Sequence, residues 1–190
     1  ADQDQAARVR ASIPAKISPN ALHVTETVFL SCLAAKERKL LDYLLLGYQE
    51  GKRLDRMLGH EAVAPVLDAY KGFWRERHHL LGFIRFADYG GALVSVISPK
   101  NFVLPYLARH FVSRYGDENF MIYDKVRHMA LICEQRNVRL VRAEGLELPP
   151  LPEQEAGYQA LWKRFYDAVA IQARENPRCR MTHLPKRYWE

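Results

Sequence analysis

The sequence has only three cysteines, Cys32, Cys133 and Cys179, and no two of them lie close together. Without a C-x-x-C pair, local spacing supports neither a zinc ribbon nor an iron–sulfur cluster. Cys179 and His183 are four residues apart, but two ligands in an irregular segment do not predict a metal site. Isolated cysteines fit reduced thiols, so we expect a cytoplasmic location and no cofactor bound by this chain.

Several familiar signatures are also missing. No run approaches ~18 apolar residues and no basic-then-apolar leader precedes the first helix, so the sequence shows neither a membrane span nor a signal peptide. There is no glycine-rich phosphate loop, H-E-x-x-H zinc helix, G-x-S-x-G nucleophile turn or EF-hand. These absences remove the functions that a short motif alone would indicate. The chain opens on Ala1 instead of Met, and we expect it to be part of a longer protein.

Composition is that of a globular protein. The 190 residues are 48% hydrophobic and 26% charged, which is enough apolar material for a substantial core. Lys and Arg number 28 against 22 Asp and Glu, a net charge of +6. A positive charge of this size fits an anionic partner, although many soluble proteins with other functions carry it too.

The first part of the chain, residues 1–81, predicts a helical subdomain that serves as scaffold. Apolar side chains recur at helical spacing after Thr25, and a long helix is expected from Glu61 to about Leu81. Before that, two prolines between Ala11 and Pro19 predict little more than one helix and a loop.

Residues 82–145 predict an antiparallel sheet of about five strands with one crossing helix. The strands are expected at 83–86, 92–97, 120–123, 128–134 and 138–143, and the helix at 99–115. A proline-rich linker, 146–158, then leads to the C-terminal part, 159–190, which begins with an amphipathic helix from Gln159 to about Arg174. The fold class is therefore α+β, and we expect these parts to form one compact unit.

The C-terminal part carries seven Lys or Arg, three acids and five aromatic rings. Cations neutralise phosphates and flat rings stack on unpaired bases, so this mixture favours contact with nucleic acid. The alternative is that the apolar stripe is ordinary core and the arginines a solvated face. The candidate contacts, with one arginine added from the hairpin, are Arg85, Arg164, Arg174, Arg178, Arg180, Lys186, Arg187, Tyr188 and Trp189.

His110, Arg114, Asp124 and Arg127 are the best candidates for a chemical site. His110 and Arg114 share a helix face because they are four residues apart, and Asp124 and Arg127 lie where the next strand ends. A histidine near an Asp–Arg pair could act as acid or base while the arginines bind phosphate. Alternatively, the Asp–Arg pair pins the strand end and the histidine lies at the edge of the core.

Four blocks of the sequence resemble one bacterial family. They are LLGFIRF (80–86), ARHFVSRYG (108–116), FMIYDKVRHMALI (120–132) and LWKRFYDAVAIQARENPRCRMTHLPKRYW (161–189). Members of that family are described as DNA metabolism or DNA repair proteins of unknown activity, encoded beside a radical-SAM protein and in some cases fused to a uracil-DNA glycosylase domain. The resemblance implies a role around DNA, with the iron–sulfur cluster and S-adenosylmethionine in the partner.

We therefore expect a DNA-associated accessory or repair protein that binds DNA, single-stranded or damaged DNA included, and works with a radical-SAM enzyme. Two alternatives stay open. One is an enzyme for a phosphate-bearing substrate, with His110 and Asp124 as acid and base. The other is a protein-binding adaptor with Trp162, Tyr188 and Trp189 as apolar anchors.

Overall fold

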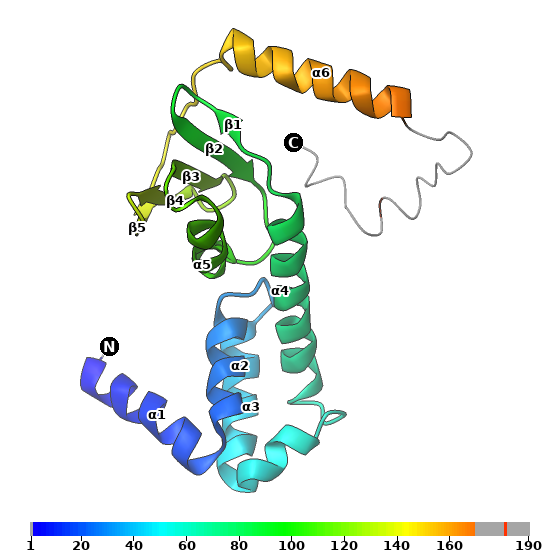
Figure 1. Ribbon diagram of the computed structural model, residues 1–190. Helices are drawn as coiled ribbons and strands as arrows, with labels where there is room; N and C mark the ends of the chain where they lie inside the picture. The colour runs from blue at the N-terminus through cyan, green and yellow to red at the C-terminus, as the bar shows by residue number, and fades with distance from the viewer. Residues whose placement is uncertain (1, 170–180, 182–190) are drawn as a thin grey trace. The chain divides into compact units, whose positions relative to one another are not determined.

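The computed structural model of the chain describes residues 2–169 and residue 181. Helices come first and a sheet follows, which confirms the α+β class (Figure 1). The elements are α1 (Gln3–Lys16), α2 (Pro19–Phe29), α3 (Lys36–Glu50), the 3₁₀ helix η1 (Gly51–Arg56), α4 (Ala64–Phe83), β1 (Ala87–Asp88), β2 (Ala92–Ile97), α5 (Leu104–Tyr115), β3 (Asn119–Asp124), β4 (Met129–Glu134), β5 (Asn137–Arg142) and α6 (Glu153–Val169).

The chain divides into two compact units. The first unit runs to Glu76 and includes residues 100–103, while the second comprises residues 77–99 and the chain from Leu104 onward. No helix in the described part of the chain is long and apolar enough to span a membrane.

At the start of the first unit the chain forms two helices, α1 and α2, where one helix and a loop were expected. Ser18 accepts a hydrogen bond from the backbone N–H of Ala21, and Pro19 occupies the first turn of α2. A proline is favourable there because the first helical N–H groups have no partner within the helix. Pro19 therefore starts a helix, and Pro14 is accommodated inside α1.

The helices of the first unit enclose an apolar core. A Cβ atom at Gly47 would lie 2.7 Å from Cδ1 of Ile17 and 2.9 Å from Cδ2 of Leu54, so a larger residue there would have to displace these two side chains. The buried side chains are Ile13, Ile17, Ala21, Val24, Val28, Leu40, Tyr43, Leu54, Val63 and Val66.

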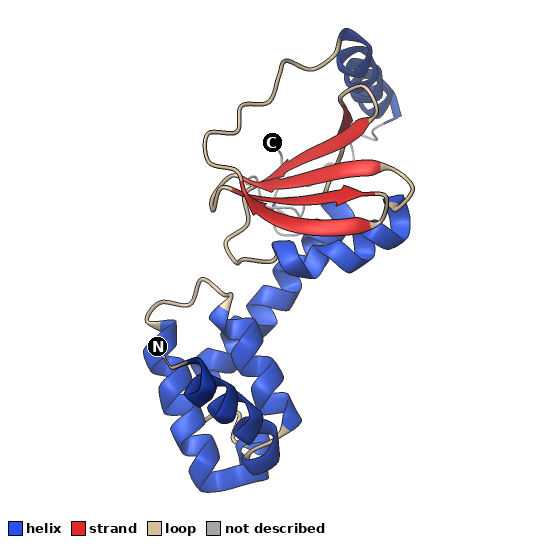
Figure 2. Cartoon of the chain, turned by 90° about the vertical axis from the view of Figure 1, so that its left-hand side faces the viewer, coloured by secondary structure: helices blue, strands red, loops and turns tan. Residues whose placement is uncertain are grey.

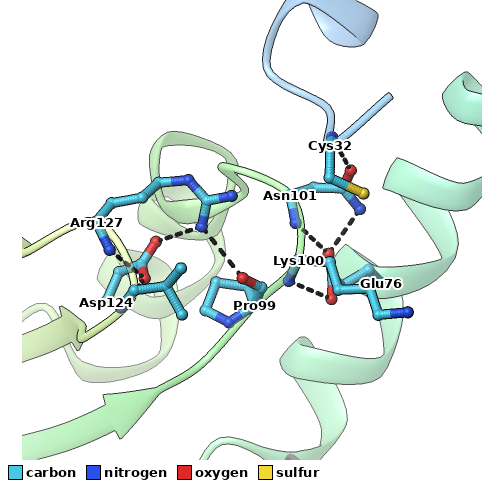
Figure 3. Close-up of polar contacts among 8 residues, drawn as sticks. Cys32, Glu76, Pro99, Lys100, Asn101, Asp124 and Arg127 are labelled. Atoms are coloured by element: carbon cyan, nitrogen blue, oxygen red, sulfur yellow. Dashed lines mark hydrogen bonds and ion pairs between the residues drawn. The ribbon is translucent and has the colours of Figure 1, made fainter. Parts of the chain in front are cut away.

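A buried carboxylate holds residues 100–103 in the first unit. Glu76 accepts hydrogen bonds from the backbone N–H groups of Lys100 (2.9 Å) and Asn101 (2.8 Å), and from the Asn101 side-chain amide (2.6 Å). The Asn101 carbonyl oxygen in turn accepts from the backbone N–H of Cys32, 2.9 Å away (Figure 3). Because this segment is held by Glu76, α5 begins at Leu104 and not at Pro99 as predicted.

The second unit contains a five-stranded sheet in the order β1-β2-β3-β4-β5 (Figure 2). The prediction of a wholly antiparallel sheet is wrong at one pairing, since β2 and β3 run parallel with Leu93 opposite Phe120. The chain crosses from β2 to β3 through α5, and a crossover helix returns it to the starting edge, so the two strands point the same way. The other three pairings are antiparallel.

The first predicted strand is also wrong in its position. Residue 83 still belongs to α4, and β1 comprises only Ala87 and Asp88. Phe86 instead packs into the core, where its ring centroid lies 5.5 Å from that of Phe111 and 5.9 Å from that of Phe120. The remaining strands are confirmed within one residue at each end, whereas α6 begins at Glu153, six residues before the expected start.

We predict that Glu76→Gln lowers the free energy of unfolding by about 2 kcal/mol. The amide replaces one acceptor with a donor that faces backbone N–H groups, and a buried donor left without an acceptor costs ~1–3 kcal/mol. Urea denaturation measures the change. Glu37→Gln on the exposed surface of α3 is the matched control and should shift stability by less than ~0.5 kcal/mol. Equal effects of the two substitutions would contradict the role given to Glu76.

We predict a loss of stability at alkaline pH that depends on Tyr43. Burial, with the nearby charge of Asp55 as the smaller cause, raises the pKa of Tyr43 from 10.0 to about 12. The unfolded chain releases this proton first, so the free energy of unfolding falls as pH rises from 10.0 toward about 12. Tyr43→Phe should make that decline shallower in urea titrations across the interval. A decline of unchanged steepness would be inconsistent with this assignment.

Candidate functional site

The outer face of α5 carries a row of polar side chains without an acid. The inner face of the helix packs on β3 and β4 and buries Leu104, Leu107 and Phe111. On the other side, five residues follow the helical spacing i, i+3, i+4, i+7 and i+8. We call them the α5 stripe: Tyr106, Arg109, His110, Ser113 and Arg114. The sequence prediction named only His110 and Arg114, although the same spacing identifies the other three.

Two cations of the α5 stripe have no carboxylate partner among the described residues. Arg109 and Arg114 are both exposed, and the guanidinium carbon of Arg114 lies 5.5 Å from the ring centroid of Tyr115. The arginines in and beside β5 are different, because each forms an ion pair. The pairs are Arg136–Asp117 at 2.8 Å, Arg139–Glu134 at 2.6 Å and Arg142–Glu144 at 3.8 Å.

Another cation is held at the start of the stripe. Nε of Arg77, in the part of α4 that belongs to the second unit, donates a hydrogen bond of 2.8 Å to the backbone carbonyl of Tyr106. This bond joins α4 to α5 within the unit. It places a positively charged side chain beside the first residue of the α5 stripe.

His110 is half-buried and packs edge-on against Phe111, with ring centroids 5.0 Å apart. Its Nε2 atom is buried and has no hydrogen-bond partner in the part of the chain that the structure describes. Buried polar atoms without a partner are uncommon, since they lose hydration and gain no bond in return. The structure therefore does not hydrogen-bond His110 Nε2 to Asp124.

Asp124 is fully buried and bonded within its own turn. Its Oδ1 atom accepts from the backbone N–H groups of Val126 (3.0 Å) and Arg127 (3.3 Å), and Oδ2 pairs with Nη1 of Arg127 at 3.0 Å. The same Nη1 donates to the carbonyl oxygen of Pro99 at 3.1 Å (Figure 3). The carboxylate thus closes the β3–β4 turn and fixes the chain after β2. This is the geometry of the structural ion pair that pins a strand end.

The other candidate contacts fall into two groups. Arg85 is exposed and bonds back to the carbonyl oxygens of Gly82 (3.2 Å) and Ile84 (3.3 Å), and Arg164 is exposed on α6. The remaining candidates lie outside the described residues, so their contact with nucleic acid stays a prediction. They are Arg174, Arg178, Arg180, Lys186, Arg187, Tyr188 and Trp189.

The described residues contain no candidate metal-binding site. Among them, no group of three or more His, Cys, Asp and Glu side chains is placed to hold a metal ion. The α5 stripe can donate hydrogen bonds and positive charge, which suits an anionic ligand.

We predict that Asp124→Asn destabilises the protein by about 3 kcal/mol. The substitution leaves Arg127 without its charge partner beside a buried turn, and breaking a buried pair costs ~3–5 kcal/mol. Asp117→Asn is the control, because the exposed Arg136–Asp117 pair contributes only ~0–1 kcal/mol. Thermal and urea unfolding of both variants make the comparison. If the Asp124 variant were as stable as the parent, the structural role assigned to Asp124 would be contradicted.

No curated protein and no solved structure matches the chain significantly. One family does match, over residues 34–190, which include every element from α3 to α6. That family, DUF4130, is described as a domain of unknown function. Because the match spans well over half of the sequence, the chain belongs to the DUF4130 family.

Proposed function

We propose that this protein binds nucleic acid through the α5 stripe and the basic and aromatic C-terminal residues, as an accessory to a radical-SAM enzyme in DNA modification or repair. The enzyme partner and the DNA role rest on the family resemblance of the four sequence blocks. The anion-binding part of the proposal is supported by the charges on α5.

The observation that carries the proposal is that Arg109 and Arg114 are exposed cations without a carboxylate partner among the described residues. An arginine that is already paired must give up its carboxylate before it contacts phosphate, and this lowers the net gain. An unpaired arginine exchanges only water and counterions, and counterion release favours binding. The α5 arginines are therefore better phosphate ligands than the paired arginines near β5.

The rest of the α5 stripe suits the same role. Ser113 and Tyr106 carry hydroxyl groups, which hydrogen-bond phosphate oxygens in protein–DNA interfaces. Such contacts position a nucleic acid without reading its sequence. We assign sequence-independent binding to α5, and the stacking of unpaired bases to Tyr188 and Trp189.

Catalysis by His110 and Asp124 has no comparable support. Asp124 is fully buried and already accepts three hydrogen bonds, so it offers no surface to a substrate. A general base must reach the proton that it removes, directly or through one water. We therefore assign Asp124 to the fold and propose no acid–base pair of Asp124 with His110.

We predict that the double variant Arg109→Ala/Arg114→Ala binds single-stranded DNA several-fold more weakly at low salt. The slope of log K against log salt should flatten by ~0.7 for each lost single-strand phosphate contact. Fluorescence anisotropy at several salt concentrations measures both quantities. The same titration with duplex, uracil-containing and abasic DNA establishes the preferred form.

The matched control is Arg136→Ala/Arg139→Ala, which removes the same charge from two paired arginines near β5. Its affinity and salt slope should stay close to those of the parent. Equal losses in both double variants would show a diffuse charge effect and contradict an α5 site. No binding by the parent at low salt would remove the proposed function altogether.

A further inference from the structure

Strand β5 forms an edge of the sheet and is open to solvent. It is last in the strand order β1-β2-β3-β4-β5, at the opposite edge from β1, and all of its residues except Val141 are exposed (Figure 1). Two of them, Val138 and Leu140, are large and apolar, with exposed fractions of 38% and 42%. An edge strand presents unpaired backbone N–H and C=O groups to which another strand can add.

Proteins usually protect such edges, and β5 lacks the usual protection. At the other edge, β1 is protected by its length of only two residues. β5 has six residues, contains neither proline nor lysine, and pairs with β4 without a bulge from Asn137 to Arg142. Its two arginines form ion pairs with Glu134 and Glu144 of the same chain. The edge is therefore suited to pairing with a further strand.

The β4–β5 hairpin determines which backbone groups of β5 point outward. The two-residue turn 135–136 has φ values of 48° and 66°, so Asn137 forms a hydrogen-bonded pair with Glu134. Bonded and non-bonded pairs then alternate, and the bond of 2.8 Å from the N–H of Ala143 to the carbonyl oxygen of His128 follows this alternation. The residues whose N–H and C=O groups point away from β4 are Val138, Leu140 and Arg142.

We propose that β5 pairs antiparallel with β5 of a second copy of this chain, with Leu140 opposite Leu140. In this register Val138 of each copy lies opposite Arg142 of the other. The outward N–H and C=O groups of both strands then all find partners, as in the antiparallel pairs of the sheet itself. Any other register leaves some of these groups beyond the end of the partner strand. The pairing does not depend on the proposed nucleic-acid binding.

The side chains of β5 are compatible with a second copy. Directly opposite residues lie on the same face of a sheet, so the two Leu140 side chains meet, and Val138 meets the aliphatic part of Arg142. On the other face, Arg139 lies opposite Val141. Like charges directly opposite one another destabilise a strand pair, and this register places no cation of β5 opposite another.

Charge complementarity at the two ends of the paired strands favours the second copy over an unrelated strand. Arg136 precedes Leu140 by four residues and Glu144 follows it by four. Antiparallel pairing centred on Leu140 therefore brings Arg136 of one copy level with Glu144 of the other, and the isologous contact repeats this at both ends. A guanidinium has donors enough for Asp117 and Glu144 together, so Arg136 keeps its own ion pair.

Sedimentation equilibrium of the full chain over a range of concentrations tests the proposal. We expect a monomer–dimer equilibrium whose dissociation constant rises at least about tenfold in Leu140→Lys and in Leu140→Glu, because each places like charges opposite one another. An equimolar mixture of the two variants should form a heterodimer that is tighter than either homodimer. The matched control is Leu58→Lys in the first unit, at a residue 62% exposed, and it should dimerise like the parent.

A parent chain that stays monomeric throughout, or a dimer that both Leu140 variants leave intact, would overturn the proposal. A mixture that associates no more tightly than the single variants would overturn the register. Circular dichroism and urea unfolding check that the Leu140 variants fold like the parent.

Amide hydrogen exchange of the parent, followed by NMR, tests the register without any substitution. Above the dissociation constant, the outward N–H groups of Val138, Leu140 and Arg142 should exchange at least about tenfold more slowly than below it, because they become hydrogen-bonded. The intervening N–H groups are bonded to β4 at every concentration and should change much less. Slowing that does not alternate along β5, or no slowing at all, would contradict the proposed pairing.

Discussion

A buried carboxylate is stable only when hydrogen bonds replace its lost hydration, and this requirement governs the chain on both sides of the Pro99–Lys100 peptide bond. On one side, Asp124 holds Arg127, and Arg127 holds the carbonyl oxygen of Pro99. On the other, Glu76 accepts the backbone N–H of Lys100. Each carboxylate works within its own unit: Asp124 fixes the chain where it leaves β2, and Glu76 fixes residues 100–103.

The position of α5 within the second unit follows from its packing on the sheet, and the candidate function follows from α5. The helix begins at Leu104, and its buried residues Leu104, Leu107 and Phe111 face β3 and β4. The opposite face carries Arg109 and Arg114, which form no ion pair with a carboxylate among the described residues. An exposed, unpaired cation on a helix anchored in this way is well prepared to meet phosphate, since little conformational freedom is lost on binding.

The sequence predicted elements well where local pattern decides them and poorly where distant contacts do. Strands β3 to β5 were located within one residue because apolar runs and turn residues bound them closely. The apolar run at residues 83–86 fits both a strand and a helix end, and the position of Phe86 is set by Phe111 and Phe120, which no local pattern reveals. The parallel pairing of β2 with β3 likewise depends on the path of α5.

For the same reason, the sequence predicted only part of the candidate site. His110 and Arg114 were found from helical spacing, but ion pairing decides which cations are available, and pairs such as Arg139–Glu134 form only in the folded sheet. Photo-crosslinking of the protein to single-stranded DNA, followed by mass spectrometry, tests the central claim most directly. The account predicts that, among the described residues, crosslinked peptides come from 104–115. Crosslinks that, among the described residues, are confined to β5 or to the first unit would contradict this account, and so would the absence of crosslinks at low salt.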